Sequence, residues 1–227
     1  FLQWPLIVAG IAIMVISLAS FAGGCYRNTV LLRLYLIVMF FVILALIFFV
    51  IFAYIVTKKG SGRRVTNRAY LDYYLQDYSG WLQRRVHRYW KSISSCVRIS
   101  KTCANMKKLN AGIPETAAMF YQRKLSPIES GCCKPLTECG FTYINETMWS
   151  LSGGVLRNKD CLLWSNVQDE LCYSCGSCEA GVLGSVRESW RKFAFVNMAA
   201  IVFLVIFYVV VFAAWRGMEK DDDLPRI

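Results

Sequence analysis

Three long stretches of this chain carry no charged residue and are apolar enough to cross a lipid bilayer. They are residues 1–24, residues 34–57 and residues 194–215. A membrane-spanning helix needs about 20 predominantly apolar residues, and each stretch meets that length. The mean hydropathy of +0.39 agrees with this pattern. The sequence therefore predicts an all-α membrane protein whose transmembrane helices form a bundle.

The first stretch has an alternative interpretation as a cleaved signal peptide. Its length, the Trp4-Pro5 step near its start and the absence of a basic segment all favour a membrane span instead. Small residues recur at Gly10, Ser17 and Gly24. Their spacing gives one helix face on which a neighbouring backbone can approach closely, although small residues are common in any membrane helix.

The polar break at residues 25–33 is so short that the two spans beside it must form an antiparallel hairpin. Arg27 and Arg33 make this break basic, which indicates the cytoplasmic side of the membrane. Cys25 lies there and is a candidate for S-palmitoylation, with an unmodified buried thiol as the alternative. The large loop, residues 58–193, then lies outside the cell, and the tail, residues 216–227, lies inside.

The composition of the large loop fits an extracellular position. Nine of the ten cysteines fall between Cys96 and Cys178, which is typical of a domain in an oxidising compartment. A sequon for N-glycosylation is present at Asn145. Nearly all of the net charge of +11 also lies in this loop, but long domains are translocated largely regardless of charge.

Apolar residues spaced by three or four predict helices in three parts of the loop. A stalk helix rising from the second span is expected after Asn67, with the apolar positions Leu71, Leu75, Tyr78, Leu82, Val86 and Tyr89. A second helix is expected from Pro114 to Leu125, and a third over Leu183, Val186, Trp190 and Phe193, leading into the last span. Residues 132–178 show no long period and are expected to be irregular.

The run Gly131-Cys132-Cys133-Lys134-Pro135 organises this irregular part. Adjacent cysteines cannot comfortably bridge each other, so each is expected to reach a different, distant partner. The glycine before them and the proline after them indicate a turn. The run is therefore predicted to draw separate parts of the loop to one point.

The nine loop cysteines are predicted to form structural disulfides. They are Cys96, Cys103, Cys132, Cys133, Cys139, Cys161, Cys172, Cys175 and Cys178. The spacing of the last three also suits a zinc cluster or a redox pair, but both require reduced thiols, which an extracellular loop does not keep.

Several functional classes are disfavoured by the residues themselves. No Ser/His/Asp set, carboxylate pair or phosphate loop is apparent, so we expect no enzyme, cofactor or metal. His87 is the only histidine and is expected on the surface. The basic residues are scattered, which favours a solvated face, or contact with lipid headgroups or acidic wall polymers, over nucleic acid.

The whole chain resembles plant tetraspanins. The matching segments are Phe1-Leu2-Gln3-Trp4-Pro5, Ala22-Gly23-Gly24-Cys25-Tyr26-Arg27-Asn28, Asn67-Arg68-Ala69-Tyr70, Asp77-Tyr78-Ser79-Gly80-Trp81, Gly131-Cys132-Cys133-Lys134-Pro135 and Cys161-Leu162-Leu163-Trp164. That family has four spans with both ends in the cytoplasm, so the chain resembles a member with three of the four spans, lacking the first. It departs from the family where Leu136 replaces a frequent second proline.

The resemblance also bears on the cysteines. It favours a link from Cys132 or Cys133 into the region from Cys161 to Cys178. Nine loop cysteines cannot all pair with one another, and the family has a further cysteine just ahead of the segment that matches Phe1. We therefore expect the ninth to pair with that residue.

The resemblance implies a membrane scaffold. Its partners would be the lipid bilayer, other tetraspanins and further membrane proteins, in plasma-membrane microdomains and plasmodesmata, with roles in cell differentiation and development. The alternative is a receptor or adhesion subunit that binds an extracellular ligand through the large loop. A transporter is disfavoured because no span contains a charged residue.

Overall fold

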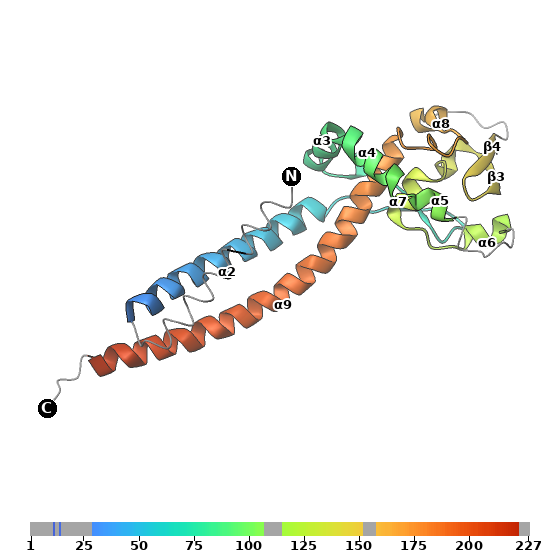
Figure 1. Ribbon diagram of the computed structural model, residues 1–227. Helices are drawn as coiled ribbons and strands as arrows, with labels where there is room; N and C mark the ends of the chain where they lie inside the picture. Colours follow the sequence, from blue (N-terminus) through green and yellow to red (C-terminus); the bar gives the residue numbers. More distant parts are fainter. Residues whose placement is uncertain (1–10, 12–13, 15–28, 107–114, 152–157, 223–227) are drawn as a thin grey trace. The chain divides into compact units, whose positions relative to one another are not determined.

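The computed structural model describes residues 11, 14, 29–106, 115–151 and 158–222. The chain divides into two compact units (Figure 1). One comprises residues 1–52 with residues 193–227, and the other is the loop unit, residues 53–192. The first predicted span and Cys25 lie outside the described residues, apart from Ile11 and Met14, which are helical.

Two helices are long and apolar enough to cross a membrane. α2 (Thr29–Thr57) contains the apolar segment Leu32–Thr57, and α9 (Gly176–Asp222) contains the segment Gly176–Gly217. The most apolar window of α9 buries none of its residues within the structure, as expected of a surface that faces lipid. The predicted spans 34–57 and 194–215 lie within these helices, and the predicted total of three spans stays a prediction.

The loop unit consists of short elements. Its helices are α3 (Gly80–Arg88), α4 (Trp90–Ile99), α5 (Thr102–Met106), α6 (Ala117–Tyr121), α7 (Pro127–Cys132) and α8 (Lys159–Leu163). Its 3-10 turns are η1 (Leu75–Asp77) and η3 (Thr137–Cys139), and its strands are β1 (Arg63–Arg64), β2 (Leu71–Asp72), β3 (Phe141–Asn145) and β4 (Met148–Leu151). The strands form two antiparallel pairs, β1 with β2 and β3 with β4.

The prediction of a stalk helix beginning after Asn67 is wrong. Asn67 has a φ of 59°, a left-handed conformation that an α-helix does not allow, and Leu71 pairs with Arg64 between two strands. The helix begins only at Gly80. Leu82 and Val86 are buried nonetheless. The spacing of apolar residues therefore predicted correctly that these positions are buried, but it did not predict where the helix begins.

The second predicted helix, Pro114 to Leu125, is shorter in the structure. It is represented by the five residues of α6, and a new helix, α7, begins where the end was predicted. Ser126 and Glu129 form a reciprocal capping box at the start of α7, with Pro127 in its first turn. This places Gly131 and Cys132 within the last turn of a helix rather than in the predicted turn.

The β3–β4 hairpin lies in the stretch that was predicted to be irregular. Its register pairs Thr142 with Ser150 and Tyr143 with Trp149, with an irregularity between Tyr143 and Asn145. The third helix prediction is confirmed, because α9 runs without a break through residues 183–193 into the apolar segment.

The largest buried cluster is aromatic and sulfur-rich. Phe120 is fully buried, and its ring lies 5.0 Å from that of Tyr143 and 5.8 Å from that of Trp149. Met106 and the side chains of four cysteines also belong to the cluster, together with Tyr70, Val97, Leu171 and Tyr173. A second cluster joins Tyr78, Leu82 and Val86 to Ala180 and Leu183 of α9. The first turns of α9 are therefore part of the core of the loop unit.

Helices α7 and α9 approach at backbone distance. A Cβ atom added to Gly181 would lie 3.3 Å from the Cα of Gly131 and would clash with the carbonyl oxygen of Pro127. A Cβ atom added to Gly131 would in turn clash with the carbonyl of Ser177. Only glycine allows this approach, and it sets the distance at which α7 packs on α9.

We predict that Gly181→Ala lowers the free energy of unfolding by about 1–3 kcal/mol, because the methyl group must displace backbone atoms. Thermal unfolding of the whole chain in mild detergent, followed by tryptophan fluorescence, measures the change. Gly80→Ala is the control, since its added Cβ meets only the flexible end of Arg84 at 3.5 Å. Equal melting temperatures for wild type and Gly181→Ala would contradict the close packing of α7 on α9.

Candidate functional site

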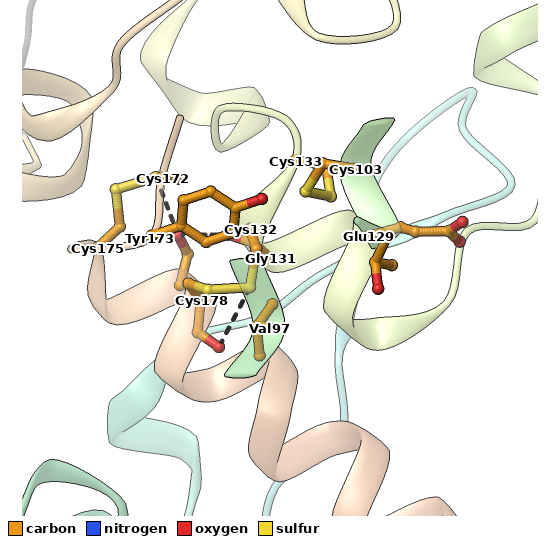
Figure 2. Close-up of a disulfide and its surroundings, with 12 residues drawn as sticks. Val97, Cys103, Glu129, Gly131, Cys132, Cys133, Cys172, Tyr173, Cys175 and Cys178 are labelled. Atoms are coloured by element: carbon orange, nitrogen blue, oxygen red, sulfur yellow. Dashed lines mark hydrogen bonds between the residues drawn. A yellow bond between two sulfur atoms is a disulfide. The ribbon is translucent and has the colours of Figure 1, made fainter. Parts of the chain in front are cut away.

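Cys132 and Cys133 send two disulfides in different directions from the end of α7 (Figure 2). Cys133 is bonded to Cys103 in α5, 30 residues earlier in the chain. Cys132 is bonded to Cys178 in the first turn of α9, 46 residues later. All four sulfur-bearing side chains are buried. This cysteine pair therefore links three helices that are far apart in the sequence.

Two further disulfides close smaller loops. Cys139 is bonded to Cys161, which joins η3 to α8 across 22 residues, and Cys172 is bonded to Cys175. The three cysteines considered for a zinc cluster are thus divided between two different bridges. Among the described residues, no group of histidine, cysteine and carboxylate side chains is arranged to hold a metal ion.

Cys96 is a free and exposed thiol, the only free cysteine in the described part of the chain. Its predicted disulfide is not among the four bridges of the structure. The partner expected from the resemblance would lie ahead of residue 1, so this pairing stays a prediction.

Lys134, next to the cysteine pair, is fully buried in an ion pair with Asp72 of β2. Its Nζ atom donates to Oδ1 of Asp72 at 2.6 Å and to the carbonyl of Pro135 at 3.2 Å. The other oxygen of Asp72 accepts from the backbone N–H of Thr137 at 2.9 Å. Burial lowers the pKa of Lys134, and the adjacent Asp72 carboxylate opposes that shift. The pair fastens β2 to the segment that follows the cysteines.

A second carboxylate organises the start of α9. The two oxygens of Asp160 accept hydrogen bonds from the backbone N–H groups of Gly176 at 2.9 Å and Ser177 at 2.7 Å. A negative group here satisfies the free amides of the helix and interacts favourably with its dipole. Sequence reasoning missed both Asp72 and Asp160, because their partners lie 62 and 16 or more residues away.

The sequon lies at the end of the β3–β4 hairpin. The Asn145 side chain is half-buried, and its oxygen accepts from the backbone N–H of Thr147 at 3.1 Å. Thr147 is buried, and its hydroxyl is hydrogen-bonded to Oε1 of Gln168 at 3.2 Å. Glycosylation of Asn145 and acylation of Cys25 stay predictions. His87 is exposed, as expected, and lies 3.2 Å from the carboxylate of Glu179.

The hairpin and the segment after α8 form one connected assembly. Asn166 accepts from the backbone N–H of Trp149 and donates to its carbonyl, each at 3.0 Å, which mimics a further strand. Exposed apolar side chains project from this assembly, and we call the set the hairpin face; its members are Ile144, Met148, Leu162 and Val167. An apolar set held by hydrogen bonds and the Cys139–Cys161 disulfide is suited to binding a protein surface.

Comparison with known proteins agrees with this architecture. A model of the tetraspanin family matches residues 1–214. The chain belongs to the tetraspanin family. It is 59% identical to Tetraspanin-4 of Arabidopsis thaliana over 223 residues, which cover 97% of this chain and 68% of that protein. It is 63% identical to Tetraspanin-3 of the same plant over 195 residues, 85% of this chain and 68% of the relative.

More distant relatives cover as much of the chain. Protein TORNADO 2 of Arabidopsis thaliana is 43% identical over 223 residues, which are 97% of this chain and 81% of the relative. No solved structure matches the chain. The matched family is one of multi-pass membrane proteins and is not a family of enzymes. The resemblance to plant tetraspanins is thereby confirmed, while a missing first span stays a prediction.

We predict that Asp72→Asn lowers the free energy of unfolding by about 3–5 kcal/mol, because it leaves the buried charge of Lys134 without its counter-ion. Thermal unfolding in detergent measures the effect. The matched control is Asp77→Asn, whose ion pair with Arg63 is at the surface and should contribute about 1 kcal/mol at most. If both variants unfold alike, the buried ion pair does not hold β2 in place.

We also predict the disulfide map of this chain. Digestion without reduction should yield peptides joined through Cys103–Cys133, Cys132–Cys178, Cys139–Cys161 and Cys172–Cys175. In a protein of residues 1–227 alone, a maleimide added before digestion should label Cys96, because its thiol is free and exposed within these residues. Mass spectrometry checks both results, and labelling of Cys132 or Cys178 under these conditions would contradict them.

Proposed function

We propose that this tetraspanin is a membrane scaffold that gathers other membrane proteins through the hairpin face of its large loop. Two features of the loop support this role. Its apolar side chains are exposed, with Leu162 at 67% and Ile144 at 54% of full accessibility. They are also held in place by disulfides and hydrogen bonds, so little conformational entropy is lost when a partner binds.

The orientation proposed for the scaffold places the large loop outside the cell and the tail inside. Four disulfides in the loop unit support it, because such bonds persist in oxidising compartments. The basic break at residues 25–33 supports a cytoplasmic position for the other end of the hairpin of spans. Glycosylation of Asn145 outside and acylation of Cys25 inside are consistent with this orientation.

The cellular role that we propose follows the family. The scaffold would act in plasma-membrane microdomains and plasmodesmata, together with other tetraspanins, and would regulate cell differentiation and development. The supporting observation is the similarity to plant tetraspanins over most of the chain. The bilayer-facing helices α2 and α9 anchor the loop at the membrane surface, where such partners are encountered.

We predict that the double substitution Ile144→Asp with Leu162→Asp lowers the recovery of membrane partners about tenfold or more, since it places two charges in an apolar interface. Affinity purification of the tagged chain from plant membranes in mild detergent, with quantitative mass spectrometry, measures the loss. The matched control is Ile99→Asp on α4, an apolar residue of 78% exposure that is not part of the hairpin face.

Two other results would contradict the proposal. Equal recovery of membrane proteins by the wild type and the double variant would exclude the hairpin face as the binding surface. Saturable recovery of one soluble extracellular ligand, without membrane proteins, would indicate a receptor instead. An unchanged disulfide map in the double variant establishes that the loop still folds, so that any loss of partners comes from the altered surface.

A further inference from the structure

Three exposed arginines lie on the outer side of α3, which Figure 1 shows at one edge of the loop unit. They are Arg84, Arg85 and Arg88. Residues three and four positions apart share one face of an α-helix, so the three side chains project from the same side. The opposite side carries Leu82 and Val86, which belong to the buried cluster that α3 forms with α9. The arginines are therefore directed to solvent by the packing of α3 itself.

The positive charge of this side of α3 is not balanced by acidic residues. No aspartate or glutamate occurs from residue 78 to residue 114, although basic residues recur throughout that stretch. Within the part of the chain that the structure describes, none of the three arginines forms an ion pair. Arg84 and Arg88 are one helical turn apart, and like charges at this spacing repel each other. A bound anion would relieve that repulsion.

An exposed tryptophan lies on the same side of α3 as the arginines. Trp81 precedes Arg84, Arg85 and Arg88 by three, four and seven residues, which is the spacing of one helix face, and it is 41% exposed. The guanidinium carbon of Arg85 lies 5.6 Å from the centroid of its ring. A guanidinium over an aromatic ring is held in place and can still bind a carboxylate through its N–H groups. We call Trp81 and the three arginines the basic face.

A uronic acid matches both features of the basic face. The flat C–H surface of its sugar ring can pack on an exposed aromatic ring, and its carboxylate can accept two parallel hydrogen bonds from one guanidinium. In a polymer of uronic acids a carboxylate recurs with every sugar, so one chain can bind several arginines that are a helical turn apart. An acidic peptide would supply the carboxylates without the sugar ring. The tryptophan therefore favours the polysaccharide.

The position of α3 along α9 favours a soluble polymer over lipid headgroups. His87, near the end of α3, lies 3.2 Å from Glu179 in the first turn of α9. About 20 Å of helix separate Glu179 from Lys192, the residue before the apolar run. At physiological ionic strength, charges in solvent are screened within about 8 Å. The end of α3 that carries Arg88 is thus well removed, along the helix, from the apolar segment.

We propose that the basic face binds a polysaccharide of uronic acids. The ring of Trp81 packs on the C–H surface of one sugar, and the guanidinium groups of α3 donate hydrogen bonds to the carboxylates of this sugar and its neighbours. The basic face shares no residue with the hairpin face, so the site does not depend on the scaffold function. Only its contact with a polymer outside the cell depends on the proposed orientation.

The experiment measures binding to the whole chain by isothermal titration calorimetry. The chain is held in nanodiscs of phosphatidylcholine, a lipid without net charge. The probe is an oligogalacturonide, and its methyl ester, which has the same rings without the charges, is the matched control. Polyglutamate supplies carboxylates without rings. We expect the oligogalacturonide to bind, more weakly at high salt, the methyl ester not to bind, and polyglutamate to bind several-fold more weakly than the oligogalacturonide.

Substitutions in the basic face locate the site. Arg88→Gln should weaken binding of the oligogalacturonide about tenfold, the loss expected for hydrogen bonds to a charged group. Trp81→Ala should weaken it several-fold, and Trp81→Phe, which keeps an aromatic ring, should retain most of the affinity. Arg64→Gln is the control, because it removes an exposed arginine of β1 outside the basic face and should leave binding unchanged. An unchanged disulfide map establishes that each variant folds.

Other results would overturn the proposal. Equal affinity for polyglutamate and the oligogalacturonide would indicate a surface for acidic peptides. Tighter binding to vesicles that contain phosphatidylserine than to the oligogalacturonide would indicate a membrane surface. Unchanged affinity in Trp81→Ala would exclude packing of a sugar on the ring, and equal losses in Arg88→Gln and Arg64→Gln would mean diffuse attraction without a site. Partner recovery through the hairpin face is measured separately, so neither result decides the other.

Discussion

Adjacent cysteines cannot bridge each other without strain, and most of the loop unit is arranged around this constraint. Cys132 and Cys133 reach α9 and α5 instead, so the last turn of α7 is bonded covalently to both. Each bridge contributes about 2–4 kcal/mol by restricting the unfolded chain. Apart from α9, the helices that they join are short, with five residues in α5 and six in α7, and short helices are marginal without tertiary support.

Non-covalent contacts also hold the elements of the loop unit together. The glycines of α7 and α9 allow the two backbones to approach, and the ion pair of Lys134 with Asp72 fastens β2 beside them. Asp160 caps the start of α9 and lies next to Cys161, which is bonded to η3. Covalent and polar contacts therefore converge on the first turns of a helix that continues into the membrane. A partner bound at the hairpin face would bind a loop that these contacts attach to the first turns of that helix.

The sequence predicted some elements of the candidate site well and others poorly. The apolar runs of α2 and α9 were apparent because a membrane span requires a certain length and hydropathy, and both are local properties of the sequence. The divergence of Cys132 and Cys133 also followed from local geometry. The hairpin face was missed because it depends on a hydrogen bond between Asn166 and the backbone of Trp149, 17 residues away. A contact over that distance leaves no pattern in the local sequence. The stalk helix was placed too early because the spacing of the apolar residues Leu71, Leu75 and Tyr78 resembled a helical period.

The sequence by itself determined that the chain has apolar helices, a cysteine-rich loop between them and the motifs of plant tetraspanins. These properties follow from composition and from spacing within a few residues. Only the tertiary structure decided which cysteines are bonded, that Lys134 is buried against Asp72, and that α3 packs on the first turns of α9. The physical reason is that each of these contacts joins residues far apart in the chain, and their distance is set by how the short elements pack.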